Sequence, residues 1–146
     1  MNRRRRPIVR AGELKATREA LGLTTLGLAR ALEVSEPTVK NWEKAKYAVP
    51  PGVEKEVRDL ERRTWEYSKR VAALAEHGMV MVYRRTEHMP QGRAADLGAP
   101  WWRAVAHGAQ RLRPDLAVGY AEELDELTGS RDATLSKAVS PRTLGL

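Results

Sequence analysis

The feature that most constrains this chain is the stretch 22–50, GLTTLGLARALEVSEPTVKNWEKAKYAVP, which predicts two short helices and a tight turn. Thr24 can cap the first helix, because its side-chain oxygen can accept a hydrogen bond from an unpaired N–H of the first turn. Leu28, Ala29 and Leu32 then give this helix one apolar face. Because Ala29 is small, we expect the helix to pack closely against a neighbouring element.

The second helix of this stretch is expected from Glu36 to Lys46 and has a polar outer face. Ser35 can cap it, and Pro37 falls in its first turn, where a missing N–H costs little. Trp42 lies on the opposite face, where packing in the core is its expected role. The arrangement can place one helix in the major groove of DNA while another helix braces it. A plain helical hairpin with no role in DNA binding is the alternative.

Several polar side chains of this helix pair are predicted to contact DNA. Asn can pair with adenine through two hydrogen bonds, and Lys can donate to the O6 and N7 atoms of guanine. Thr25 is expected to reach a phosphate or a base. An acidic residue such as Glu36 is unusual beside a polyanion. It fits only if it accepts a hydrogen bond from cytosine or points away from the DNA. The predicted contacts of this region are Thr25, Ser35, Glu36, Thr38, Lys40, Asn41, Lys44 and Lys46.

This segment resembles the helix-turn-helix of the lambda repressor/Cro type, the XRE family, over about residues 14–60. Two residues depart from the family pattern: Glu33 in the turn and Ala45 after the second helix stand where the family often has Gly. A non-Gly residue in the left-handed conformation carries a strain of about 1 kcal/mol or more, so a slightly altered turn is expected. The matching residues are Leu21-Gly22-Leu23-Thr24, Leu28-Ala29, Val34-Ser35, Thr38-Val39, Trp42-Glu43 and Pro50.

The resemblance also implies an ion pair between Arg18 and Glu43. In the family, an Arg of the first helix pairs with the Glu that follows the aromatic residue of the second helix of the motif. Here the first helix is expected over residues 11–21, and Arg18 lies on the same side as Leu14 and Leu21, where an unpaired guanidinium would be costly. A bidentate pair would tie the first helix of the chain to the third, which is a structural role.

The net charge of +7 is concentrated at the N-terminal end. Residues 1–50 contain 11 Lys or Arg against 5 Asp or Glu, residues 51–76 contain 6 of each, and residues 77–146 contain 9 against 8. The excess indicates a surface suited to phosphate. Four adjacent like charges repel one another. The four adjacent arginines are Arg3, Arg4, Arg5 and Arg6. They are predicted to form an arm that follows phosphates or enters a minor groove. The alternative is a solubilising tail.

A long amphipathic helix is predicted after Pro50, because apolar residues recur at steps of four and three from Val53 to Leu74. It is expected to end near His77-Gly78, with Gly just past the helix end. These features predict a basic arm over residues 1–10 and a helix-turn-helix domain over residues 11–76. Residues 77–128 would form a C-terminal dimerisation region.

Residues 79–84 change to a strand-like pattern and give the one strand expected in the chain. A lone strand cannot satisfy its own backbone, so its partner is predicted to be the same strand of a second subunit, paired antiparallel. A helix is predicted from Trp101 to Leu112. Because two adjacent Trp cannot both face one small core, at least one is expected to pack across the dimer interface. The alternatives are that both Trp cap a monomeric core, or that the interface lies on the seam of the long helix. The predicted dimerisation residues are Val80, Met81, Val82, Tyr83, Trp101, Trp102 and Val105.

The rest of the C-terminal half is less regular in sequence. Residues 87–99 predict a loop with one short helical turn, residues 116–127 a helix with acidic residues on its outer side, and residues 129–146 a flexible tail. The order of elements resembles that of YdiL-like proteins and of some anti-CRISPR-associated autorepressors. Those proteins join a lambda-type reader to a C-terminal dimerisation region, so the resemblance implies dimerisation.

The fold class expected is therefore mainly α: an N-terminal helix-turn-helix bundle of four to five helices, a long connecting helix, and a small α+β region with one strand. An enzyme is not expected, because His77, His88 and His107 are scattered and no phosphate-binding loop or nucleophile motif is present. No metal site or cofactor is predicted. With no Cys and no run of 18 apolar residues, the protein is expected to be soluble and cytoplasmic, without contact to a membrane.

The leading hypothesis is a homodimeric, sequence-specific transcriptional repressor that binds an inverted-repeat operator in double-stranded DNA. It would be autoregulatory and associated with a phage or mobile element. The alternatives are an antitoxin-like module that binds another protein and uses DNA binding for autoregulation, and an RNA-binding regulator, because basic helices also follow RNA phosphates.

Overall fold

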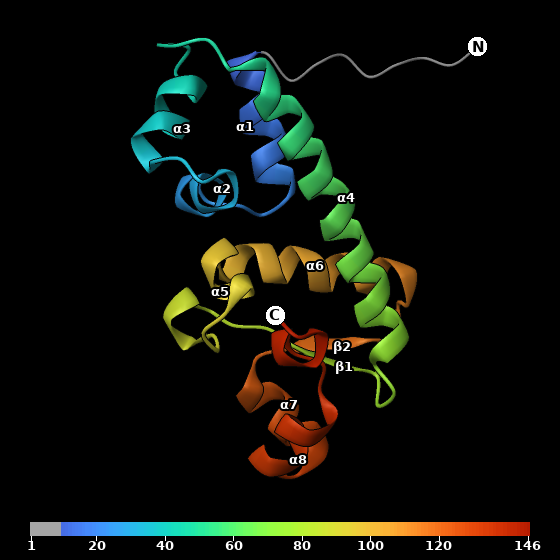
Figure 1. Cartoon of the computed structure of the whole chain (residues 1–146). Coiled ribbons are helices and arrows are strands. Elements are labelled where there is room, and N and C mark those ends of the chain that lie inside the picture. Colours follow the sequence, from blue (N-terminus) through green and yellow to red (C-terminus); the bar gives the residue numbers. More distant parts are fainter. Residues whose placement is uncertain (1–9) are drawn as a thin grey trace, which may run out of the picture.

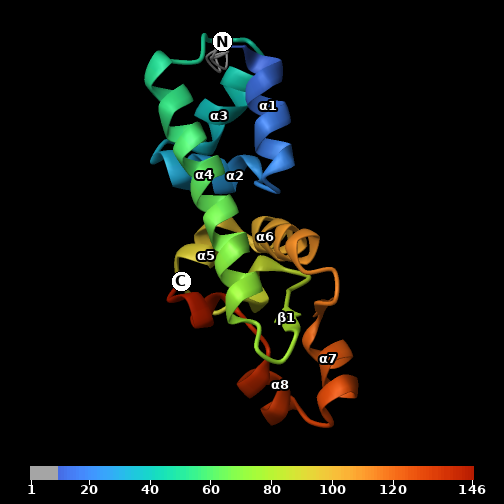
Figure 2. The same ribbon diagram turned by 90° about the vertical axis from the view of Figure 1, so that its right-hand side faces the viewer.

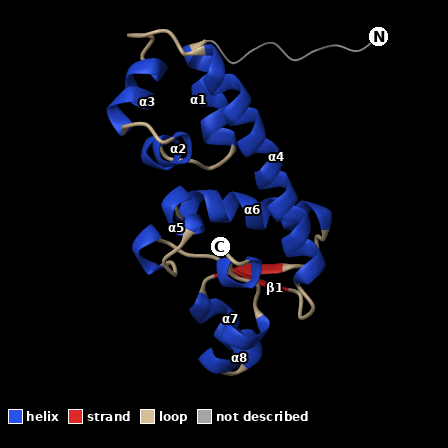
Figure 3. Ribbon diagram, viewed as in Figure 1, coloured by secondary structure: helices blue, strands red, loops and turns tan. Residues whose placement is uncertain are grey.

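The computed structural model describes residues 10–146, so the predicted basic arm of residues 3–6 lies outside the described part. Within that part the chain forms eight α-helices and one two-stranded parallel sheet, which confirms the predicted mainly α class with a small α+β region (Figures 1 and 3). In chain order the elements are α1 (Ala11–Ala20), α2 (Thr25–Leu32), α3 (Glu36–Glu43), α4 (Pro51–Leu74), β1 (Met79–Met81), α5 (Arg93–Leu97), α6 (Ala99–Leu112), β2 (Ala117–Gly119), α7 (Ala121–Thr128) and α8 (Arg131–Lys137), with short 3₁₀ helices η1 (Thr86–His88) and η2 (Pro141–Leu144).

The helix-turn-helix unit forms as its caps predict. The Thr24 side chain accepts a hydrogen bond from the Gly27 N–H at 2.9 Å, and the Ser35 hydroxyl accepts from the Thr38 N–H at 3.3 Å. Glu33, the residue that ends α2, has φ 58° and ψ 41°, which is the left-handed conformation expected at this departure from the family pattern. The turn therefore carries the strain of a non-Gly residue in this conformation.

The helix that follows the turn is shorter than predicted. It ends at Glu43 rather than Lys46, because Ala45 has φ 58° and reverses the chain direction. The Lys46 N–H then donates to the Asn41 carbonyl at 2.9 Å, which closes the end of the helix. Lys44 is the C-cap and Lys46 lies outside the helix, so the two side chains do not continue one helical face.

Helix α4 connects the two ends of the molecule (Figures 1 and 2). Its first half packs beside α1–α3 and its second half packs on α6, where the Ser68 hydroxyl donates to the Val105 carbonyl at 2.9 Å. It ends at Leu74, before the predicted His77-Gly78, and the Leu74 side chain is 43% exposed. A seven-residue repeat drifts around a straight helix, which has 3.6 residues per turn, and this drift accounts for an exposed last position.

The predicted pairing of the strand is wrong. Strand β1 pairs parallel with β2 of the same chain, Met79 opposite Ala117. On its other side, Val139 donates to the Met79 carbonyl and accepts from the Met81 N–H, both at 2.9 Å. Both edges of β1 are thus occupied within one chain, and a second subunit has no free backbone there to pair with. The strand is also shorter than the expected 79–84, although the Val82 N–H still donates to the Gly119 carbonyl at 2.9 Å.

The predicted dimerisation side chains are mostly buried in their own chain, which leaves them little surface for a contact with a second subunit. Trp101 and Trp102 are 1% and 0% exposed, because α6 has core on two sides. The Trp101 indole N–H donates to the Thr64 hydroxyl of α4 at 3.0 Å, whereas the Trp102 indole N–H donates to the Met81 carbonyl of β1 at 2.8 Å. The alternative seam on α4 is buried as well, including Val53, Val57, Leu60, Thr64 and Val71. Of the other predicted interface residues, Tyr83 is partly buried. The rest are buried: Val80, Met81, Val82 and Val105.

The C-terminal segment differs most from expectation. Residues 116–127, predicted as one helix, form β2 and then α7. Residues 129–146, predicted as a flexible tail, contain α8 and η2, and Val139, Pro141 and Leu144 are buried. The small apolar side chains of this segment lack a helical period because they fill gaps beside the sheet rather than one face of a helix. The resulting apolar core is continuous from Leu14 to Leu144.

Candidate nucleic-acid interface

Helix α3 lies at the edge of the N-terminal bundle with one apolar and one polar face (Figure 1). Val39 is fully buried and Trp42 is 7% exposed, which confirms the core role expected for Trp42. On the other side, Lys40 and Lys44 are exposed, and Thr38 and Asn41 are partly exposed. The structure thus brings Lys40, Asn41 and Lys44 to one surface of α3 and its C-cap.

The Arg18–Glu43 pair that the resemblance implied is present. The Arg18 Nε donates to Glu43 Oε2 at 2.7 Å and an Nη donates to Oε1 at 2.9 Å. The other Nη donates to the Leu23 carbonyl at 2.9 Å. The two side chains are only 12% and 8% exposed, and the hydrogen bonds to Glu43 raise the pKa of Arg18 above its ordinary value. The pair fixes the C-terminal end of α3 to α1 in one orientation.

Glu36 links the N-termini of α2 and α3. The Thr25 hydroxyl donates to Glu36 Oε2 at 2.7 Å, and the Lys40 ammonium lies 3.6 Å from Oε1. The Thr25 hydrogen bond, followed by the Lys40 charge, lowers the pKa of the Glu36 carboxyl. Neither role considered for Glu36 in the sequence describes this bridge, which joins residues of two different helices. The Thr25 hydroxyl proton is thus already engaged within the protein.

The remaining predicted contacts divide into two groups. The Ser35 and Thr38 hydroxyls lie 2.7 Å apart and hold each other at the start of α3. Lys46 lies beyond the helix, with its ammonium 5.6 Å from the centroid of the Tyr47 ring. Tyr47, for which no role was predicted, is 58% exposed.

Acidic side chains elsewhere in the described residues form ion pairs rather than a metal site. Across residues 10–146, no group of three or more His, Asp or Glu side chains is arranged to hold a metal ion. On the acidic side of α7, Glu122 pairs with Arg84, and Asp125 pairs with Arg131 at 2.9 Å. The hydrogen bond from Arg131 lowers the pKa of Asp125. No helix in this part of the chain combines the length and apolar character that crossing a membrane requires.

No protein-family model matches the chain, and no curated protein is similar to it in sequence. A functional assignment therefore rests on the geometry of α1–α3 itself.

Proposed function

We propose that this protein is a sequence-specific, DNA-binding transcriptional repressor in which α3 is the reading helix and α2 braces it. The observation that carries the proposal is a helix with an accessible polar face whose opposite face is held rigidly. Val39 and Trp42 anchor that helix in the core, and the Arg18–Glu43 pair fixes its end. Base-edge recognition needs side chains held in place by a supporting shell, and this arrangement supplies one.

The side chains on this surface are of the types that read DNA. Asn41 can form two hydrogen bonds with adenine, and Lys40 or Lys44 can donate to guanine or to phosphate. Residues 1–50 contain 11 Lys or Arg against 5 Asp or Glu, and this local excess favours a polyanion. Such a protein would act in the cytoplasm, where its DNA target is accessible.

A homodimer is part of the proposal, because two reading helices one DNA turn apart would recognise an inverted repeat. With the strand and the Trp pair buried, the interface is assigned to exposed apolar side chains on α4 and α6. Trp65 is 43% exposed and its ring lies close to Gly108, 3.9 Å from where a Cβ on that residue would be. Leu112, one turn further along α6, is also 43% exposed. We assign these two exposed side chains to the contact with a second copy, and call them the patch.

Two experiments test these points. The protein is mixed with fragments of its source genome, and the retained DNA is sequenced. We expect enrichment of one inverted repeat. Retention without any shared sequence would contradict the proposal. Preferential retention of RNA, or a stoichiometric protein partner found on purification, would favour the RNA-binding or antitoxin-like alternative.

The dimer is tested by sedimentation of the full chain. We expect the native protein to sediment as a dimer at micromolar concentration and Trp65→Glu to sediment as a folded monomer. The control is Leu135→Glu on α8, which changes a side chain of 59% exposure away from the patch. A Trp65→Glu variant that stays dimeric would place the interface elsewhere.

A further inference from the structure

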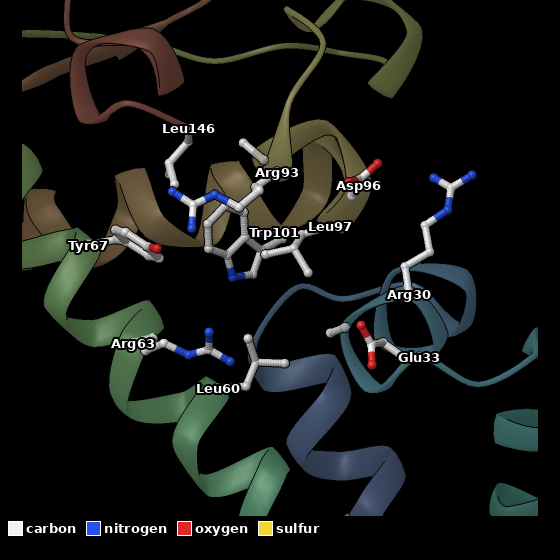
Figure 4. Close-up of a pocket in the computed structure, with 12 residues that line it drawn as sticks. Arg30, Glu33, Leu60, Arg63, Tyr67, Arg93, Asp96, Leu97, Trp101 and Leu146 are labelled. Atoms are coloured by element: carbon white, nitrogen blue, oxygen red, sulfur yellow. The ribbon is translucent and has the colours of Figure 1, made fainter.

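A cavity lies where α2, α4, α5 and α6 meet, away from the polar face of α3 (Figure 4). Its volume is about 510 Å³, within the range of sites that bind small molecules. The apolar part of its wall includes Leu60, Leu97, Trp101 and Leu146. The Tyr67 ring stands edge-on to the Trp101 ring, with the two centroids 5.7 Å apart, and closes one side. This wall suits the apolar body of a ligand.

Three arginines from three different helices line the same cavity: Arg30 of α2, Arg63 of α4 and Arg93 of α5. Within residues 10–146, no carboxylate lies within 4.0 Å of any of these guanidinium groups to form an ion pair. In Figure 4, the Arg93 guanidinium lies above the Trp101 indole and the Arg63 guanidinium lies below it. Arginines without a carboxylate partner beside an apolar wall are the chemistry that binds an organic anion.

The two acidic side chains of the cavity do not occupy the space between Arg63 and Arg93. Asp96 lies beside Arg30 on the far side of the opening, and Glu33 approaches from the turn after α2 (Figure 4). These two carboxylates offset the charge of Arg30. The cavity lining thus contains three arginines against two acidic side chains.

We propose that this cavity binds a small organic anion with an apolar body. Arg63 and Arg93 supply the positive charge that binds the anionic group, and the body lies against Leu60, Leu97 and the edge of Tyr67. A carboxylate, sulfonate or phosphate on a flat ring system satisfies this chemistry.

The cavity also adjoins the contact between the helix-turn-helix unit and the C-terminal half. Helix α2 approaches α5 so closely that a Cβ on Gly27 would lie 2.5 Å from the Leu97 carbonyl oxygen. Leu97 and Arg30 line the cavity from the two sides of this contact. A ligand that touches α2, α4 and α5 together favours one placement of α2, and with it of α3. This consequence for DNA rests on the proposed function, whereas binding of the anion does not.

The test uses the full chain and the fluorescent anion 8-anilinonaphthalene-1-sulfonate as probe. We expect saturable binding at one site, with affinity lowered about tenfold or more in Arg63→Gln and in Arg93→Gln. The matched control is Arg70→Gln, an exposed arginine two turns further along α4 that does not line the cavity. The neutral analogue N-phenyl-1-naphthylamine has the same aromatic body and is expected to bind more weakly. Equal affinities for all variants, or for the two probes, would overturn the proposal.

A second measurement separates this proposal from the proposed function. The probe is added while binding to the retained DNA is measured, and we expect the DNA affinity to change about fivefold or more in the native protein. The change should be absent in the double variant Arg63→Gln, Arg93→Gln. A chain that binds the probe with the expected variant pattern and retains no DNA would support the anion site and contradict the repressor. Unchanged DNA affinity at saturating probe would contradict the coupling.

Discussion

The contacts that stabilise the two halves of the molecule join residues at different separations in the sequence. In α1–α3, caps and the Arg18–Glu43 pair join residues at most 25 positions apart, and one polar surface stays accessible. In the C-terminal half, Met79 pairs with Ala117 and Val80 with Val139, and the aromatic side chains are covered. The first half is therefore suited to presenting a helix, whereas the second half encloses its own sheet and, together with α2 and α4, lines a cavity.

The largest effect is expected from breaking the ion pair that holds the first half. Arg18→Ala leaves the Glu43 carboxylate buried without its partner, which should lower the free energy of unfolding by about 3–5 kcal/mol in a urea titration. The matched control is Arg10→Ala, whose partner Glu13 lies 3.6 Å away on the surface, and about 0.5 kcal/mol or less is expected there. Similar losses for the two variants would mean that the pair does not fix α3.

A smaller effect is expected from the second half. Trp102→Phe removes the indole N–H that donates to the Met81 carbonyl at 2.8 Å and leaves a small void. The cost should be about 1–3 kcal/mol of unfolding free energy. Trp65→Phe is the control, because its side chain is 43% exposed and the described residues show no hydrogen bond to its indole. If Trp102→Phe were as mild as this control, α6 would not be the element that anchors the sheet.

The difference between the halves also explains what the sequence could predict. Thr24 and Ser35 act on N–H groups three residues away, so their patterns predicted the helix starts correctly. Arg18–Glu43 joins distant residues, and the resemblance to a known motif implied it. The Thr25–Glu36 bridge had no such signal, because no periodic pattern relates residues of two helices that cross.

The wrong predictions for the C-terminal half have one physical cause: its elements contact residues that are far away in the sequence. The strand-like pattern of β1 predicted a partner, but β2 has only Ala117–Gly119, too short to stand out in the sequence. Val139 was assigned to a tail because a single bridging residue has no pattern. The two Trp were assigned to an interface because the sequence does not show that α6 lies between α4 and the sheet. The cavity arginines come from three separate helices and were missed for the same reason.

The smallest effect on stability is expected at Ala45, just after the end of α3. Ala45 has φ 58°, a conformation that costs an L-residue about 1–2 kcal/mol, whereas Gly adopts it freely. Ala45→Gly should therefore raise the free energy of unfolding by about 0.5–1 kcal/mol, after the extra freedom of Gly in the unfolded chain is counted. Ala48→Gly, in the following loop at a residue without positive φ, should instead lower it by about 0.4–1 kcal/mol. A loss in both variants would mean that the turn carries no strain.

The central claim is that the polar face of α3 reads base edges. The most direct test compares Asn41→Ala with the native chain on the retained inverted repeat and on random DNA of equal length and salt concentration. The change should weaken binding to the repeat by about 1–3 kcal/mol and binding to random DNA far less. Gln91→Ala, an exposed amide in the loop before α5, is the control and should leave both affinities unchanged. Equal losses on the repeat and on random DNA, or no loss on either, would contradict the assignment of α3 as the reading helix.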